Sequence, residues 1–528
     1  MEQINHRQPL IITLIAALTI IFVGLTVRPL FPIDETRYVS VAWEMWIHNN
    51  WLVPHINGNT YAHKPPMMFW LINIAWGIFG VSDWVARAVV PTLSLINFFL
   101  IYKLSKNLFP EKSSVVYSPL ILLGFSGWLL YTTMTMFDLL LTVSVLSYLL
   151  TSFKFAQTEK RLYIYLAGIA LGCGLLTKGP AVFIYTLPLF LAYPLWKSTE
   201  MVEKKVWYKQ GLIAIIIGIA VILVWVIPAV IFGGAEYRNE LLWGQTAGRM
   251  VNSFAHARPA YWYLQMLPVL TLPWIFIRLL WRKTTWRIAS TGDRYTLIGF
   301  ISTFLIFSLV SGKQIHYLFP AFPMLAIYFA SKVDLQHKFV KEYLVVALLL
   351  ILSLALLTSR FWITKVFKTA DSASVYEILF IIPLAFAWLI YRGEKLGRYY
   401  LSVLFLAMPI TIMTVVSTAS PMLHKVYDIE PMSMAIKAEQ DKGVTVAYWG
   451  KYPNIYQFTG RLEHSLVLPK SSPDAMKWLQ EHPDALVVYT QKHKTEIAQK
   501  AILEHPFRNR YQMLVKASDL YQHLTPSN

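Results

Sequence analysis

The stretch LIITLIAALTIIFVGLTV, residues 10–27, decides the class of fold, because it holds no charged side chain over its whole length. About 20 apolar residues cover the ~30 Å hydrocarbon core of a bilayer. Residues 211–232 form a second such run, and 56% of the chain is hydrophobic while 14% is charged. Arg28 and Pro29 follow the first run without a small-residue cleavage site, which indicates a retained span rather than a signal peptide. The sequence therefore predicts a polytopic α-helical membrane protein.

The formal net charge of +18 does not indicate a nucleic-acid partner. The basic residues stand in short clusters between the apolar runs, where they set the orientation of a membrane protein. The single cysteine, Cys173, lies inside an apolar run. A lone cysteine excludes an intrachain disulfide and a cysteine metal site, and we interpret it as a small buried core residue.

Hydropathy predicts about thirteen transmembrane helices, separated by loops of two kinds. The predicted spans lie near residues 10–28, 84–108, 114–132, 134–153, 162–178, 180–196, 211–232, 261–281, 295–311, 315–331, 342–359, 375–391 and 399–418. Short loops rich in Lys and Arg are expected to face the cytoplasm, together with the N-terminus. These loops are residues 103–112, 154–161, 197–209, 282–294, 332–341 and 392–398. The other connections, which include residues 29–83 and 233–260, then face outward.

One apolar segment, residues 65–81, is not counted among the spans. If it crossed the membrane, every later loop would change sides and the basic clusters would face outward. Its Trp and Phe content is typical of a helix that lies in the interfacial region. We therefore predict interfacial helices within a first outer loop of residues 29–83.

The composition changes near Lys425. Strands are predicted at residues 444–449 and 485–489, and helices at residues 473–481 and 495–505. We expect a transmembrane domain over residues 1–424 and a soluble α/β domain of about 100 residues over 425–528, a usual domain size. An odd number of spans places this domain outside, with acceptor docking and a lid as its open roles.

The outer loops and turns collect the candidate functional groups. Ionisable residues at membrane depth, or just above it, are costly and therefore point to function. The predicted topology brings eight of them to one face: Asp34, Lys64, Asp138, Lys178, His256, Arg258, Lys313 and Tyr317. Lys and Arg neutralise phosphate, and a carboxylate can act as a base or stabilise cationic character at a sugar. This combination suits a polyprenyl-phosphate sugar donor.

Two of these groups also have ordinary interpretations. Asp34 and Glu35 suit the start of a helix, with Asp34 as the N-cap and Glu35 in the first turn. Lys64, which precedes two prolines, is also typical of a cation that extends toward the interface.

Four motifs carry a family resemblance. They are Pro-x-Asp-Glu-x-Arg-Tyr at residues 32–38, Trp-Leu-Val-Pro-x-x-Asn-Gly at 51–58, Lys-Pro-Pro at 64–66, and Ser-Gly-Lys with the following Tyr and Pro at 311–320. In this order they resemble the bacterial lipid A aminoarabinose transferases (ArnT) of the protein O-mannosyltransferase superfamily. The resemblance implies a GT-C fold and a glycosyltransferase in the bacterial inner membrane. Such an enzyme moves a sugar from undecaprenyl phosphate to lipid A phosphate on the periplasmic side.

The resemblance also implies residue roles. Asp34 matches the catalytic acidic residue, with Glu35 beside it as a further candidate, and Asp138 matches a second functional carboxylate. Lys64 and Tyr317 match groups that hold the carrier phosphate, and Arg258 matches a third. Lys313 and Lys178 are added as further cations. The hypothesis is a single displacement with inversion, in which these groups hold the departing phosphate.

A metal site is a weaker expectation. The family often carries Glu before Lys-Pro-Pro, where zinc can bind together with a later His. This chain has His63 at that position, and His256 would be the later ligand. Two interfacial histidines are the alternative interpretation. We expect chemistry that requires no cofactor, and a structural zinc ion stays open.

Two other functions remain in view. A protein O-mannosyltransferase-like enzyme would share the fold and use a Ser or Thr acceptor. A transporter of lipid-linked sugars would favour inverted repeats, and the sequence has no such symmetry. We expect a monomer embedded in membrane lipid, and the identity of the sugar is open.

Overall fold

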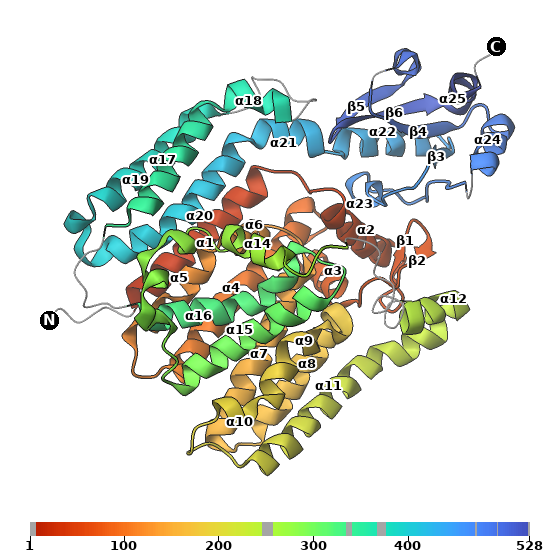
Figure 1. Cartoon of the computed structure of the whole chain (residues 1–528). Coiled ribbons are helices and arrows are strands. Elements are labelled where there is room, and N and C mark those ends of the chain that lie inside the picture. Colours follow the sequence, from red (N-terminus) through yellow and green to blue (C-terminus); the bar gives the residue numbers. More distant parts are fainter. Residues whose placement is uncertain are drawn as a thin grey trace.

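The structure is a computed structural model, and it describes residues 7–244, 257–333, 341–366, 376–469, 472–493 and 495–525. Figure 1 shows a bundle of helices with a small β-sheet at one end, close to α2 and the β1–β2 hairpin. The largest group of buried apolar residues lies inside the bundle, and the sheet has two smaller cores of its own.

Six helical stretches of the described residues are long and apolar enough to cross a membrane, or seven if one bent pair counts as a span. They are α1 (Arg7–Thr26), α4 (Asp83–Leu108), α7 (Phe137–Thr158), Leu162–Leu191, α11 (Lys204–Phe232) and α20 (Tyr400–Thr418), and the bent pair joins Ser113–Leu123 to Ser126–Thr132 at 66°. The predicted class, a polytopic helical membrane protein, is confirmed. The count of thirteen spans stays a prediction.

Several predicted spans are built from shorter pieces. These pieces are α5 (Ser118–Leu123), α6 (Ser126–Thr132), α16 (Phe322–Lys332), α17 (Tyr343–Leu357) and α19 (Ile381–Tyr391). In contrast, α15 (Thr291–Leu309) is a single helix of 19 residues. The prediction of one helix over residues 261–281 is wrong. Helix α14 (Trp262–Leu270) ends after nine residues, and short 3-10 turns follow it. Pro273 lacks a backbone N–H, so it cannot continue the ladder of helical hydrogen bonds.

The stretch Leu162–Leu191 reverses direction at its centre. Lys178, the last residue of α8 (Leu162–Lys178), contacts Asp138 at the start of α7. Beyond α9 (Val182–Leu191), Trp196 of α10 (Tyr193–Trp196) stacks on Phe153, near the other end of α7. The chain therefore turns back at Gly179, where φ is +62° and glycine is favoured.

Helices α8 and α11 approach closely because glycines line their contact. A Cβ atom at Gly172 would lie 2.4 Å from Cβ of Val221, and one at Gly168 would lie 2.6 Å from Cβ of Ile217. These distances are shorter than van der Waals contact, so larger side chains would push the helices apart.

We expect Gly172→Leu to lower stability by about 1–3 kcal/mol, the usual cost of overpacking. The measurement is the thermal unfolding midpoint of the detergent-solubilised protein. Gly77→Leu is the matched control, because a Cβ at Gly77 of α3 (Met67–Phe79) meets nothing within 4 Å. Equal midpoints for the two variants would contradict the close contact.

The segment predicted as the first outer loop holds α2 (Asp34–Ile47), a hairpin of β1 (His55–Ile56) and β2 (Asn59–Thr60), and α3. The 13 residues of α3 extend about 20 Å at 1.5 Å per residue, which is too short to cross a bilayer upright. Helix α3 packs on α2 and α4 instead. The N-cap of α2 is Ile33, and no side chain caps it, so the interpretation of Asp34 as the N-cap is wrong.

After α21 (Ser420–Tyr427), the chain forms a four-stranded sheet in the order β3-β4-β6-β5. The strands are β3 (Val446–Tyr448), β4 (Leu486–Gln491), β5 (Leu503–Phe507) and β6 (Arg510–Lys516), and only the β3–β4 pair is parallel. Alternate residues of β4 face two cores, Leu486 and Val488 on one side and Val487 and Tyr489 on the other. Helix α22 (Glu430–Gln440) covers the first side, and α24 (Ser472–Glu481) and α25 (Ala517–Leu524) cover the second.

The predicted helix over residues 495–505 is wrong in its second half. A short 3-10 turn, Glu496–Lys500, is followed by β5, which pairs antiparallel with β6. Pairing with β6 therefore overrides the local preference of these residues for helix. Pro506 is tolerated because β5 is an edge strand.

Candidate active site

The centre of the site is a buried ion pair between two transmembrane helices. Asp138 lies in the first turn of α7, and its Oδ1 atom is 2.6 Å from Nζ of Lys178 at the end of α8. Nε2 of His316, in the 3-10 turn Ile315–Ala321, is 3.9 Å from Oδ2 of the same carboxylate. A carboxylate at a helix start and a cation at a helix end both suit the helix dipole. One carboxylate thus faces two groups that can carry positive charge.

Aromatic rings surround this ion pair. Nζ of Lys178 lies 4.8 Å from the ring centroid of Tyr317, and the Tyr185 hydroxyl donates to the Tyr317 carbonyl at 2.7 Å. Nζ of Lys64 lies 5.9 Å from the ring centroid of Phe137, the residue next to Asp138. Lys64, Asp138, Lys178 and Tyr317, which the sequence placed on one face, are therefore close together.

Asp34 reaches the same region from α2. Its side chain is 54% exposed, and its Oδ1 atom is 3.7 Å from Nη1 of Arg37, one turn further along the helix. Burial raises the pKa of Tyr38 well above its usual value, and the charges of Asp34 and Asp138 raise it further. The Tyr38 phenol therefore stays neutral, and it is one helical turn after Asp34 on α2. Tyr38 also packs edge-on against Phe137, with 4.9 Å between the ring centroids.

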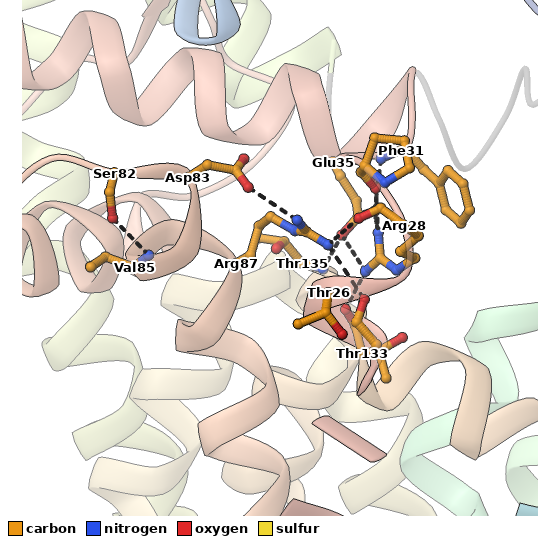
Figure 2. Close-up of polar contacts among 12 residues, drawn as sticks. Thr26, Arg28, Phe31, Glu35, Ser82, Asp83, Val85, Arg87, Thr133 and Thr135 are labelled. Carbon is orange, nitrogen blue, oxygen red and sulfur yellow. Dashed lines mark hydrogen bonds and ion pairs between the residues drawn. The ribbon is translucent and has the colours of Figure 1, made fainter. Parts of the chain in front are cut away.

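Glu35, the neighbour of Asp34, is completely buried. Its carboxylate accepts hydrogen bonds from both terminal nitrogens of Arg28, at 2.5 and 3.1 Å, and from the backbone N–H groups of Phe31 and Thr135, at 3.0 and 2.6 Å. Figure 2 shows this cluster, with Arg87 and Asp83 beside it. We predicted Glu35 as a catalytic candidate, but four donors and full burial give it the geometry of a structural anchor.

This anchor joins segments that are distant in the sequence. Arg28 also donates to the carbonyl of Thr133, and Arg87 of α4 donates to the carbonyl of Arg28 at 2.7 Å. Thr135 lies just before α7, which carries Asp138. Glu35 therefore ties the start of α2, next to Asp34, to the start of α7.

Lys313 and Arg258 are joined to each other. Lys313 is buried, and its Nζ donates to the carbonyls of Arg258, at 3.1 Å, and Val310. Burial lowers the pKa of Lys313. These contacts hold the turn at Arg258, and the role of Lys313 as a further phosphate cation stays a prediction.

Arg258 itself is exposed, and its guanidinium lies 5.8 Å from the ring centroid of Trp262. Within the described residues, no contact joins Arg258 to Asp138 or Asp34. The role of Arg258 in holding the carrier phosphate stays a prediction.

The proposed metal ligands are only partly described. His63 is exposed, and its Nε2 atom is 3.3 Å from Oε1 of Glu240. His256 lies outside the described residues. The described residues hold no group of three or more His, Cys, Asp and Glu side chains arranged for a metal. His63 and Glu240 provide two of the four ligands that a structural zinc site usually has.

Two residues of this region were not predicted as part of the site. Arg37 was quoted in the first motif without a role, although its place one helical turn after Asp34 could have identified it. His316 precedes Tyr317 in the fourth motif, and its contact with Asp138 depends on how α7 and the 315–321 turn pack together.

Comparison with known proteins gives sequence relatives for a large part of the chain. The family model of dolichyl-phosphate-mannose-protein mannosyltransferases matches residues 63–225. An undecaprenyl phosphate-alpha-4-amino-4-deoxy-L-arabinose arabinosyl transferase from Edwardsiella ictaluri is 29% identical over 323 residues, which is 58% of this chain and 56% of the relative. The protein of the same name from Erwinia tasmaniensis is 27% identical over 320 residues, with the same coverage. The chain thus spans about half the length of these relatives.

Comparison with solved structures extends over nearly the whole chain. The crystal structure of ArnT from Cupriavidus metallidurans in the apo state matches with a TM-score of 0.73 at 17% identity, covering 97% of this chain and 98% of that chain. The same protein bound to undecaprenyl phosphate matches with a TM-score of 0.71. The fold is therefore that of a GT-C type polytopic membrane protein. The chain is therefore similar to these arabinosyl transferases in sequence and to ArnT in fold, as its four motifs led us to expect.

Proposed function

We propose that the protein is a glycosyltransferase of the bacterial inner membrane that moves aminoarabinose, or a related sugar, from undecaprenyl phosphate to lipid A phosphate. The observation that carries this proposal is the grouping of Asp34, Asp138, Lys64 and Lys178 around the packed rings of Tyr38 and Phe137. Cations beside carboxylates suit a donor whose phosphate must be held while its sugar gains cationic character. The names of the sequence relatives support the donor and the sugar.

In the proposed reaction, the bond between the anomeric carbon and the carrier phosphate oxygen breaks, and undecaprenyl phosphate leaves with the electron pair. An oxygen of the acceptor phosphate forms the new bond from the opposite face, so the configuration inverts. Lys64, Lys178 and Arg37 neutralise the departing phosphate, and Tyr317 orients it. Fixed cations stabilise developing charge most strongly where water is excluded.

Asp34 orients the sugar or the acceptor in this scheme. An anionic phosphate acceptor needs no base, whereas a hydroxyl acceptor must lose a proton, which Asp34 would then take. The proposed topology has the N-terminus in the cytoplasm and the C-terminal sheet in the periplasm, and the proposed enzyme is a monomer.

The test is mass spectrometry of lipid A from cells that lack this gene, complemented with wild-type or Asp34→Asn protein. We expect the sugar adduct on lipid A phosphate to return only with the wild-type gene. Lipid A that is identical in the deletion and wild-type cells would exclude this acceptor.

A protein acceptor is the second candidate, because the family model that matches residues 63–225 describes protein mannosyltransferases. Glycosylated Ser or Thr residues in periplasmic proteins, lost in the deletion strain while lipid A is unchanged, would favour this alternative.

We expect Lys64→Met to weaken binding of the carrier phosphate about 10- to 100-fold, because a hydrogen bond to a charged group contributes ~1.5–3 kcal/mol. The measurement is the Kd of undecaprenyl phosphate for the purified protein, by calorimetric titration. Lys103→Met is the matched control, since Lys103 also lies over an aromatic ring, 5.3 Å from the centroid of Phe99 on α4. An unchanged Kd for Lys64→Met would remove Lys64 from the phosphate site.

A further inference from the structure

A buried amide joins the hairpin of the first outer loop to the C-terminal sheet unit. Asn57 lies in the β1–β2 turn with φ of +51° and is almost fully buried. Its Oδ1 atom accepts from Nε2 of Gln457 at 2.8 Å and from the backbone N–H of Leu466 at 2.9 Å. Its Nδ2 atom donates to the carbonyl of Leu466 at 3.0 Å. Both ends of one side chain therefore bind the C-terminal unit.

The same turn is tied to α2. The carboxylate of Glu44, a buried residue of α2, accepts from the backbone N–H of Asn57 and, at 3.0 Å, from that of Gly58. On the other side, Oε1 of Gln457 accepts from the Tyr452 hydroxyl at 2.9 Å. A continuous polar network thus runs from α2 through the hairpin into the C-terminal unit. Buried polar networks of this kind specify one arrangement when every member is paired.

Aromatic packing closes the same junction. Phe458 of α23 (Tyr456–Thr459) stacks on Trp76 of α3, with ring centroids 5.2 Å apart and an interplanar angle of 15°. Trp43 of α2 donates to the carbonyl of Leu462 at 2.9 Å, and the backbone N–H of Phe458 donates to Ser40 Oγ at 3.3 Å. Figure 1 shows α23 beside α2.

Movement of the C-terminal unit away from α2 would be costly. It would break the five hydrogen bonds that join the side chains of Asn57, Trp43 and Ser40 to the C-terminal unit. It would also expose the stacked faces of Trp76 and Phe458, both of which are buried. Unpaired buried amides and exposed aromatic faces both oppose such an opening.

We infer that the C-terminal unit is a fixed clamp on α2, and that Asn57 and Gln457 are positioning residues that keep Asp34 and Arg37 in place for sugar transfer. The inference rests on the proposed function, because the position of α2 affects transfer only if Asp34 acts there. A clamp differs from a lid in that no turnover step requires the junction to open.

An engineered disulfide separates a clamp from a lid. A Cβ atom at Gly58 would lie 3.8 Å from Cβ of Ser465, which is a normal separation for a disulfide. In the full chain with Cys173→Ala, we expect Gly58→Cys with Ser465→Cys to crosslink and to transfer sugar equally fast before and after reduction. The single Gly58→Cys variant controls for strain at φ of +74°. Activity that is lost on crosslinking and restored by reduction would overturn the clamp.

Removal of the amides tests the two positioning residues. Asn57→Gly keeps the positive φ and removes the side chain, and Gln457→Leu keeps the approximate volume of Gln457. We expect each variant to lower kcat about tenfold with little change in donor KM, because small misplacement of a reacting group costs up to ~100-fold. The double variant should lose no more than Asn57→Gly alone, since the hydrogen bond from Gln457 to Asn57 is already absent from that variant. Additive losses, or wild-type kcat in both single variants, would contradict a shared joint.

Hydrogen exchange gives a readout that does not depend on activity. The amides of α2 should exchange about tenfold faster in Asn57→Gly than in wild type, which corresponds to ~1.4 kcal/mol of local stability. Gln499→Leu, at an exposed site of the C-terminal unit, should leave them unchanged. Protection of α2 that is equal in all three proteins would overturn the clamp. If wild-type protein shows protection but no transfer, the proposed function fails while the clamp stands.

Discussion

Asp34→Asn is expected to abolish sugar transfer while the protein folds and binds its carrier normally. Asn has nearly the same size as Asp but lacks the charge that stabilises a cationic sugar or accepts a proton, effects that contribute about 10²–10⁴-fold in rate. The fold should survive because Asp34 is 54% exposed and its ion pair with Arg37 spans 3.7 Å. Exposed pairs of this kind contribute about 0–1 kcal/mol to stability.

The measurement is kcat with purified protein, undecaprenyl-linked donor and lipid A, together with the Kd of the carrier. Asp83→Asn is the matched control, because Asp83 is also a partly exposed aspartate paired with an arginine on its own helix. Transfer at the wild-type rate by Asp34→Asn would exclude Asp34 from the mechanism. The size of a partial loss would distinguish the acceptors, since only a hydroxyl acceptor requires Asp34 as a base.

Glu35→Ala is expected to destabilise the protein by about 3–5 kcal/mol, the cost of leaving one partner of a buried ion pair alone. Arg28 would keep its charge in a buried position, and the N–H groups of Phe31 and Thr135 would lose their acceptor. Because folded proteins are stable by only about 5–15 kcal/mol, much of the variant should fail to fold.

The measurement is the yield and thermal midpoint of folded protein after extraction from the membrane. Glu394→Ala is the control, because Glu394 pairs with Lys341 at 3.8 Å and is 69% exposed. Wild-type stability combined with lost transfer would make Glu35 a catalytic residue after all. Reduced stability with proportionate activity in the folded fraction agrees with an anchor.

The grouping of Asp138 with Lys178 shows how much the sequence alone can predict. The alternation of apolar runs and basic loops predicted that both residues lie at adjoining ends of neighbouring helices. In the structure, Oδ1 of Asp138 and Nζ of Lys178 lie 2.6 Å apart. The class of fold followed from the same alternation, since apolar runs of about 20 residues are typical of membrane-spanning helices.

The roles of Glu35 and Lys313 could not be predicted in the same way. Asp34 and Glu35 are neighbours in the sequence, but one is exposed and the other is buried against donors that include Thr135, a hundred positions away. Lys313 was counted as a cation by its type, whereas its Nζ is occupied by two carbonyls. Such roles depend on the direction of the side chain and on backbone partners that are distant in the sequence. Neither produces a periodic pattern of residues from which it could be predicted. For the same reason strand β5 was predicted as helix, because its partner β6 lies outside the local window.

The junction at Asn57 has a consequence for how the protein is made. Its partner Gln457 is 400 residues further along the chain. At about 5–20 residues per second, synthesis of that interval takes roughly 20–80 s. The helix that carries Asp34 therefore reaches the membrane surface well before its clamp exists. Once α4 and α7 have been made, it is held by Glu35 and neighbouring helices alone. A chain that ends before the sheet unit would retain every group around Asp138, yet lack the part that completes the environment of α2.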